Sequence, residues 1–351
     1  MAQIETGVKE VDPRHQLDVD RLEQFIRANL DDFEGSLQVR QFVGGQSNPT
    51  YHLTDGEREW VLRRKPPGKL ISSAHAIDRE FRVLTALGKV EFPVPRTRVY
   101  CEDESVIGTE FYLMDKVEGR ILVDQMLPGW TPDGRKRLYE SQLEILARLH
   151  RIDYAAIGLG DYGKAGNYFA RQIHVWSKQY TQANGERSSA MERLIEWLPE
   201  NVPDDVETTL VHGDYGLNNL VIHPTEPRLV GVLDWELSTL GHPVSDLTYH
   251  LSQRLAPKGH FEGKTEAEIA QLGIPTQQEY IARYCELTGR EGIPQLDFYF
   301  AFHLFRTAGI MFGIAGRAKA GTAAGAEALE LGKRALPLAD RSLAIAKRLG
   351  V

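Results

Sequence analysis

Cysteine is scarce in this 351-residue sequence, which contains only Cys101 and Cys285. Their spacing matches neither a disulfide framework nor a zinc site, so we expect neither, and two reduced thiols suit a cytoplasmic protein. Positive charge is also in deficit, because 41 lysines and arginines stand against 49 aspartates and glutamates and give a net charge of −8. This balance argues against nucleic acid as the main partner and permits a cationic ligand, although such a charge usually only keeps a protein soluble.

A long uncharged apolar segment is missing as well. Residues 1–22 contain no apolar signal core. The longest apolar run, Phe298–Gly316, carries His303 and Arg306 near its centre, and charge is costly in the middle of a bilayer. A buried helix explains this run better than a membrane span. We therefore expect a soluble, cytoplasmic protein without a membrane partner.

The first third of the chain has the pattern of a small α+β domain. Apolar residues recur at helical spacing over residues 16–34, and an alternation of period two follows over residues 36–66, interrupted by two glycine-containing turn signals. A second helical pattern over residues 72–88 leads into two further strand patterns over residues 94–119. Five strands and one long helix are therefore expected by about residue 115.

The sequence beyond this point is mainly helical. Amphipathic segments occur at residues 134–152 and 169–183, and several more follow from residue 277 onward. This change divides the chain into an N-terminal lobe, residues 1–115, and a C-terminal lobe, residues 116–351. The predicted fold class is α+β, with a small antiparallel sheet followed by helices.

One strand-like region interrupts the helical part and carries many polar side chains. The segment LVHGDYGLNNLVIH is followed by a proline-rich turn and by LVGVLDWE, which predicts a hairpin of Asn219–Ile222 and Leu229–Asp234. Pairing Ile222 with Leu229 places Asn219 opposite about Val232. Asn219 and Asp234 then lie at the same open end of the hairpin, with Asp214 in the loop just ahead.

Two carboxylates and a carboxamide in this arrangement suit phosphoryl transfer. Mg²⁺ prefers oxygen ligands, which Asn219 and Asp234 supply together with nucleotide phosphates. A separate carboxylate, Asp214, can orient the attacking hydroxyl and accept its proton. The spacing of Asp214 and Asn219 is that of a kinase catalytic loop, and Asp234 follows 20 residues after Asp214.

With the motifs HGDYGLNN, VLDWE and GHPVSDL, the sequence resembles the aminoglycoside phosphotransferase and choline kinase-like family over nearly its whole length. The stretches FVGGQSNPTY and EDESVIGTEFYLMDKVEGRI are similar to the phosphotransferase domain fused to certain eukaryotic acyl-CoA dehydrogenases. We expect a free-standing relative of that domain. The resemblance implies a bilobal protein-kinase-like fold that uses ATP and Mg²⁺. It also implies that Asp246, together with His212, supports the catalytic loop.

The resemblance identifies candidate nucleotide-binding residues in the N-terminal lobe. Arg63 occupies the position of the phosphate-binding cation, with Arg64 and Lys65 as open alternatives because a slip of one residue reverses the face of a strand. Glu80, on the following helix, would hold that cation.

Two further segments complete the expected nucleotide site. The hinge would bind adenine through backbone groups from Asp115 to Val117. The loop GGQSNPTY would cover the phosphates with Ser47 and Asn48, although it lacks a GxGxxG pattern and a plain hairpin turn explains it nearly as well.

The function expected from the resemblance is ATP- and magnesium-dependent phosphorylation of a small-molecule hydroxyl. The branch implies an anionic acceptor, a hydroxy acid or its acyl-CoA thioester, and Arg306, Arg317 and Lys319 are candidates to bind it. An aminoglycoside or other amino-sugar or amino-alcohol kinase is the alternative in the same chemistry. A nucleotide-binding pseudokinase scaffold is a third, disfavoured because the Asp-Asn-Asp set is intact. A homodimer is left open.

Overall fold

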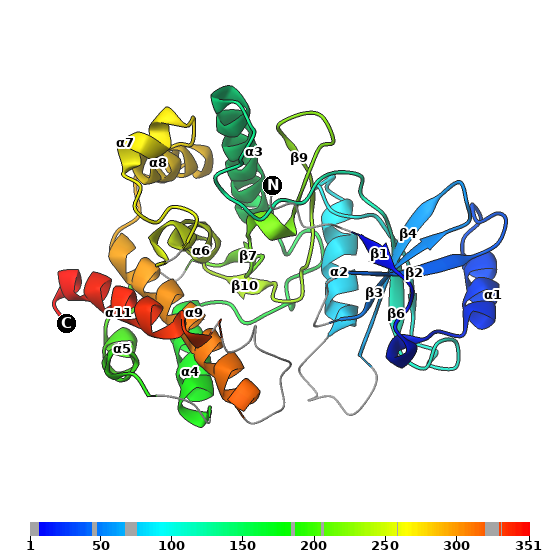
Figure 1. The fold of residues 1–351 in the computed structure, drawn as a ribbon, viewed down its shortest axis with the longest axis horizontal. Coiled ribbons are helices and arrows are strands. Elements are labelled where there is room, and N and C mark those ends of the chain that lie inside the picture. Colours follow the sequence, from blue (N-terminus) through cyan, green and yellow to red (C-terminus); the bar gives the residue numbers. More distant parts are fainter. Residues whose placement is uncertain are drawn as a thin grey trace. The chain divides into compact units, whose positions relative to one another are not determined.

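The chain forms two compact units, whose elements are labelled in Figure 1. Unit 1 contains residues 1–124, 153–162 and 217–238, and unit 2 contains residues 125–152, 163–216 and 239–351. The computed structural model describes residues 7–43, 48–66, 76–183, 187–204, 207–257, 259–319, 330 and 332–351.

Unit 1 is built around a six-stranded antiparallel sheet with the strand order β1-β2-β3-β4-β6-β5. The five strands expected from the sequence are present, and a two-residue edge strand, β1, adds to them. The strands are β1 (Val8–Lys9), β2 (Gln38–Phe42), β3 (Thr50–Thr54), β4 (Glu59–Arg64), β5 (Thr97–Cys101) and β6 (Phe111–Asp115).

Two helices, α1 (Val19–Asn29) and α2 (Ile77–Gly88), cover opposite faces of this sheet (Figure 1). Alternation along β4 sends Trp60 and Leu62 into the apolar core beneath α1. The intervening residues of β4 face the other way, so Arg63 lies on the α2 side. Arg64 returns to the α1 side, where its guanidinium lies 5.4 Å from the Tyr51 ring centroid. The pleat therefore separates two adjacent arginines.

The predicted hairpin is present as β8 (Leu220–Ile222) and β9 (Leu229–Val232) and belongs to unit 1. Ile222 pairs with Leu229 as expected, but a register shift beside it places Leu220, not Asn219, opposite Val232. A bulge adds a residue to one strand, and sequence alternation alone does not locate it. The backbone oxygen of Asn219 still accepts a hydrogen bond from the Leu233 N–H at 2.8 Å.

The hairpin packs on the segment that follows β6. Arg120 forms an isolated antiparallel bridge with Ile222, and a Cβ atom on Gly231 would meet the Val117 side chain at 3.1 Å. Unit 1 therefore gathers segments from the expected C-terminal lobe, so the predicted split between residues 115 and 116 does not coincide with the compact units.

Unit 2 is mainly helical. A short antiparallel pair, β7 (Thr209–Val211) with β10 (Thr239–Gly241), joins two segments whose pairing the sequence did not indicate. The long apolar helix α9 (Leu296–Lys319) could cross a membrane by length and composition alone, but 67% of its most apolar window is buried, as in a core helix. The helices are α3 (Pro132–Arg151), α4 (Tyr168–Gln182), α5 (Ser189–Glu200), α6 (Val244–Leu255), α7 (Glu266–Gln271), α8 (Gln277–Thr288), α9 (Leu296–Lys319) and α11 (Ala335–Ala346).

Substituting Gly119 by Ala tests the packing of the hairpin against the segment that follows β6 within unit 1. An added Cβ would lie 2.4 Å from both the Ile222 oxygen and the Val221 Cγ1 atom, so we expect Gly119→Ala to lower the free energy of unfolding by about 1–3 kcal/mol. Gly88→Ala is the matched control, because nothing lies within 4 Å of its added Cβ. Equal urea midpoints for the two variants would contradict this packing.

Candidate active site

Unit 1 contains a cavity of about 680 Å³ on the α2 side of its sheet. Its walls come from β4, β6, the segment after β6, and the open end of the β8–β9 hairpin. Apolar side chains such as Val61, Met114 and Leu233 form part of the lining, and Arg63, Glu80, Asn219 and Asp234 supply polar groups. A pocket of this size with a few convergent polar groups is suited to a small molecule.

Arg63 lies among three carboxylates, two of which, Glu80 and Asp234, also line this cavity. Its Nη1 atom is 3.0 Å from Glu80 Oε1, and its Nη2 atom is 3.2 Å from Asp234 Oδ1 and 3.8 Å from Glu236 Oε2. Burial alone would lower the pKa of Arg63, but Glu80 and the other acidic neighbours raise it above the ordinary value. Burial raises the pKa of Glu80, and Arg63 opposes that rise. Arg63 is therefore a permanent cation, and the buried Glu80 carboxylate holds it in position.

The positions of Arg63, Arg64 and Lys65 show which of these basic residues reaches the cavity. Arg64 is buried on the opposite face of the sheet. Lys65 pairs with Glu110 at 2.6 Å. Of the three candidates left open by the sequence, Arg63 alone is among the residues that line this cavity in the described part of the chain.

Asp234 and Asn219 provide oxygen atoms at the open end of the hairpin. Asp234 has a φ of 63°, a left-handed conformation that is uncommon outside glycine but that Asp tolerates. Asn219 is buried, and its Oδ1 accepts a hydrogen bond from Asn218 at 3.0 Å. One carboxylate and one carboxamide are hard oxygen donors of the kind that Mg²⁺ takes alongside phosphates, so the residues present fit that ion.

The remaining predicted nucleotide-binding residues are placed unequally. Asp115 and Val117 line the cavity. The N–H of Asp115 donates to the Arg96 oxygen at 2.8 Å, whereas that of Val117 has no hydrogen-bond partner within the described ranges. Asn48 is buried and donates to Glu236 at 3.4 Å, and it is not among the residues that line the cavity in the described part of the chain. Ser47 lies outside the described residues.

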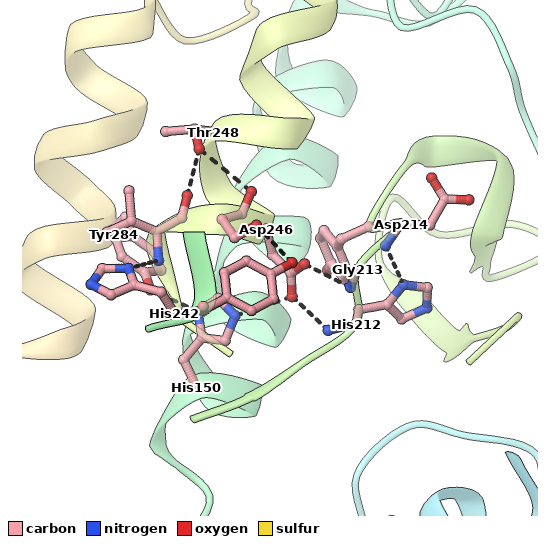
Figure 2. A network of polar contacts seen from close by, with 12 residues as sticks. His150, His212, Gly213, Asp214, His242, Asp246, Thr248 and Tyr284 are labelled. Carbon is pink, nitrogen blue, oxygen red and sulfur yellow. Dashed lines mark hydrogen bonds and ion pairs between the residues drawn. The ribbon is translucent and has the colours of Figure 1, made fainter. Parts of the chain in front are cut away.

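In unit 2 the segment after β7 is held by a buried carboxylate (Figure 2). Asp246, in the first turn of α6, accepts the backbone N–H groups of His212 at 2.7 Å and Gly213 at 2.8 Å. Its side chain also lies 3.3 Å from His150 Nε2. Burial by itself would raise the pKa of Asp246. The pKa is nevertheless lowered, because His150 bonds to the carboxylate, the charges of His150 and His212 favour its ionised form, and the His212 N–H donates to it.

The conformation of this loop is fixed on both sides of Gly213. Gly213 has a φ of 83°, a left-handed value that a side chain would disfavour. His212 Nδ1 accepts the Asp214 N–H at 3.2 Å. His150, which contacts Asp246, is held in turn by the Tyr284 hydroxyl, 2.6 Å from its Nδ1 atom. Figure 2 shows the Asp214 carboxylate pointing away from the Asp246 network. The loop therefore presents one half-buried carboxylate on a rigid backbone.

Of the candidate acceptor-binding residues, Arg306 differs from expectation. Arg306 was predicted to face an anionic ligand, but it is 5% exposed, and both of its Nη atoms donate to the Gly213 oxygen at 3.1 Å. Its place in an apolar helical run already indicated burial. Arg317 is exposed on α9, and the side chain of Lys319 lies outside the described part.

Two residues near the predicted site were missed from the sequence. Glu236 contacts Arg63 and Asn48, and it follows Asp234 by two residues in the DWE motif. Tyr249 donates a hydrogen bond to Asp214 Oδ1. It lies three residues after Asp246 on α6, a spacing that places both on one helix face and could have indicated it.

The chain is similar to known proteins over most of its length. The family model for the phosphotransferase enzyme family (APH) matches residues 38–299. Acyl-CoA dehydrogenase family member 11 of Homo sapiens is 41% identical over 98% of this chain and 45% of that protein. The chain spans less than half the length of the curated relatives it matches, from 31% to 46%.

Solved structures share the fold. A protein of Ralstonia eutropha JMP134, provisionally assigned as an aminoglycoside phosphotransferase, matches with a TM-score of 0.87 and 46% identity over 95% of this chain and 99% of that one. Choline kinase from Cryptosporidium parvum (TM-score 0.61, 13% identity, 95% and 96% covered) shares the fold alone. So does a mutant of aminoglycoside phosphotransferase APH(4)-Ia in a ternary complex with ADP and hygromycin B (0.61, 16%, 92% and 98%). The predicted kinase-like fold is confirmed.

The buried Asp246 network predicts a pH-dependent loss of stability. Asp246→Asn should lower the free energy of unfolding at pH 7 by about 3–5 kcal/mol, because it breaks a buried charged network. The folded pKa of Asp246 is depressed, so its contribution is present above the unfolded value of 3.8 and is lost as pH falls through the folded pKa.

Urea unfolding at pH 7 and below pH 3.8 measures this difference. The gap between wild type and Asp246→Asn should narrow in acid. Asp161→Asn, which removes an exposed partner of Arg82, should leave stability nearly unchanged. A gap of equal size at both pH values would show that Asp246 does not act through its charge.

Proposed function

The chain belongs to the phosphotransferase enzyme family, and on that premise we propose that it transfers the γ-phosphoryl group of ATP to a hydroxyl of an anionic small molecule. The acceptor we propose is a hydroxy acid or its acyl-CoA thioester. The observation that carries this proposal is the unit 1 cavity, where Arg63, held by Glu80, contacts Asp234, and where Asn219 is also part of the lining.

The residues of unit 1 would bind the nucleotide. Arg63 is a cation held in place, and its guanidinium can form two parallel hydrogen bonds to phosphate oxygens. The apolar lining suits adenine, and the N–H of Val117 is a donor for its edge. A bound Mg²⁺, held by Asn219 and Asp234, would neutralise charge on the phosphates. The ADP bound to the distantly related APH(4)-Ia supports a nucleotide at this kind of site.

Asp214 would act on the acceptor. Its carboxylate would orient the hydroxyl and take the proton as the oxygen attacks the γ-phosphorus. The new P–O bond forms as the bond between the γ-phosphorus and the β–γ bridging oxygen breaks, and ADP leaves. The bonds from Asp246 to the loop keep Asp214 in place, so little reorganisation is needed at the moment of transfer.

The acceptor class rests on two observations. The human relative is named for acyl-CoA dehydrogenases and matches this chain at 41% identity. A kinase within that protein would share an acyl-CoA or acid with the rest of the same chain. Exposed Arg317 on α9 adds a positive charge to unit 2. The provisional assignment of the Ralstonia protein favours the second candidate, an aminoglycoside or amino-alcohol acceptor.

A panel of acceptors with wild type and Asp214→Asn tests this function. Purified protein with MgATP is offered hydroxy acids, hydroxyacyl-CoAs, amino alcohols and aminoglycosides, and phosphorylated products are identified by mass spectrometry. We expect an acid or thioester to be preferred. Asp214→Asn should lower kcat by about 10²-fold or more, since general base catalysis contributes 10²–10⁴, while ATP affinity stays within a few-fold. Preference for an aminoglycoside would replace the acceptor, and full activity of Asp214→Asn would refute the base.

A further inference from the structure

Helix α6 of unit 2 holds the Asp214 loop at two points. Asp246, in its first turn, binds the backbone of His212 and Gly213. Tyr249, three residues later, donates its hydroxyl to Asp214 Oδ1. Since residues three apart lie on one helix face, a single rigid element fixes both the backbone of the loop and the carboxylate that it carries.

The Tyr249 ring is itself held from the side of α9. The Arg306 guanidinium lies 5.4 Å from the Tyr249 ring centroid and 5.3 Å from that of Trp176. The same guanidinium donates twice to the Gly213 oxygen. His303, one turn earlier on α9, packs edge-on to Tyr249 at 5.8 Å. The phenol therefore has little freedom to turn away from Asp214.

The hydroxyl of Tyr249 remains a proton donor across the ordinary pH range. Burial, together with the neighbouring Asp214 charge, raises the pKa of Tyr249 above its usual value. An O–H bond to a carboxylate is among the stronger hydrogen bonds in proteins. The hydrogen bond from Tyr249 to Asp214 therefore persists over this pH range. Because its hydroxyl stays protonated, Tyr249 does not accept the acceptor's proton in place of Asp214.

We propose that Tyr249 is a positioning residue for the phosphoryl transfer: by binding Asp214 Oδ1 it sets the rotation of the carboxylate and so the direction of its other oxygen. The proposal rests on the proposed function, in which Asp214 takes the acceptor's proton. Carboxylates lacking such a bond turn about their Cβ–Cγ bond, and small misplacements of a reacting group cost up to about 10²-fold in rate.

Tyr249→Phe removes the hydroxyl and keeps the ring against Arg306. We expect kcat to fall ten- to a hundredfold while KM for ATP stays within about twofold, because an interaction with the base acts on the chemical step. Tyr139→Phe is the matched control. It deletes another buried phenol of unit 2, whose hydroxyl donates to the Gln125 oxygen at 2.7 Å, and should leave kcat within about twofold.

A double-mutant cycle with Asp214→Asn gives a readout that a purely structural role would not move. In the Asp214→Asn background, Tyr249→Phe should have little further effect on the residual rate, since the two residues act as one unit. Thermal unfolding of both phenylalanine variants measures the cost of losing a phenol.

The outcomes separate the two claims. Wild-type kcat in Tyr249→Phe, an equal loss in Tyr139→Phe, or a full additional loss on top of Asp214→Asn would each overturn the role of Tyr249. If Asp214→Asn itself kept full activity, the proposed function would fail instead, whatever Tyr249→Phe does.

Discussion

The arrangement of unit 2 depends on one buried carboxylate, that of Asp246. A charge fully removed from water is costly unless it is hydrogen-bonded. Here two consecutive backbone N–H groups and His150 meet that need. The same bonds hold the loop in a conformation with a left-handed residue at position 213, which glycine adopts easily. They thereby fix the position of the next residue, Asp214. The hydrogen bonds that offset the cost of burying Asp246 therefore also fix the position of Asp214.

Unit 1 uses the same principle with the opposite charge. Arg63 is a buried cation, and Glu80, Asp234 and Glu236 surround it. Glu80 is the most deeply buried of the three, so it acts as the permanent partner. Asp234 and Glu236 are more exposed and can be shared with a ligand. The contact between Arg63 and Asp234 means that anionic phosphates would compete for the arginine, and a cation for the aspartate. Under the proposed function, binding of a nucleotide and a cation at this cavity would exchange one set of ion pairs for another.

Local patterns carried much of the prediction. Period-two alternation located the strands. The polar loop between two apolar flanks made Asp214 and Asn219 candidates, and the end of the following hairpin made Asp234 one. Long-range features escaped it. The bulge that shifts Leu220 opposite Val232 and the pairing of β7 with β10 depend on contacts that no short window contains. Arg306 was judged by its charge, although its apolar surroundings on α9 indicated burial. Tyr249 was missed because its partner lies 35 residues away in the sequence.

The central claim, that Arg63 is the cation of the nucleotide site, is tested most directly by calorimetric titration of MgATP. Arg63→Met combined with Glu80→Gln removes the cation without leaving a buried carboxylate unpaired. Arg64→Met changes the adjacent arginine on the other face of β4. We expect the first variant to lose at least about tenfold in affinity, about 1.4 kcal/mol, and the second to stay within about twofold of wild type. Wild-type affinity in the first variant, or an equal loss in Arg64→Met, would contradict the account.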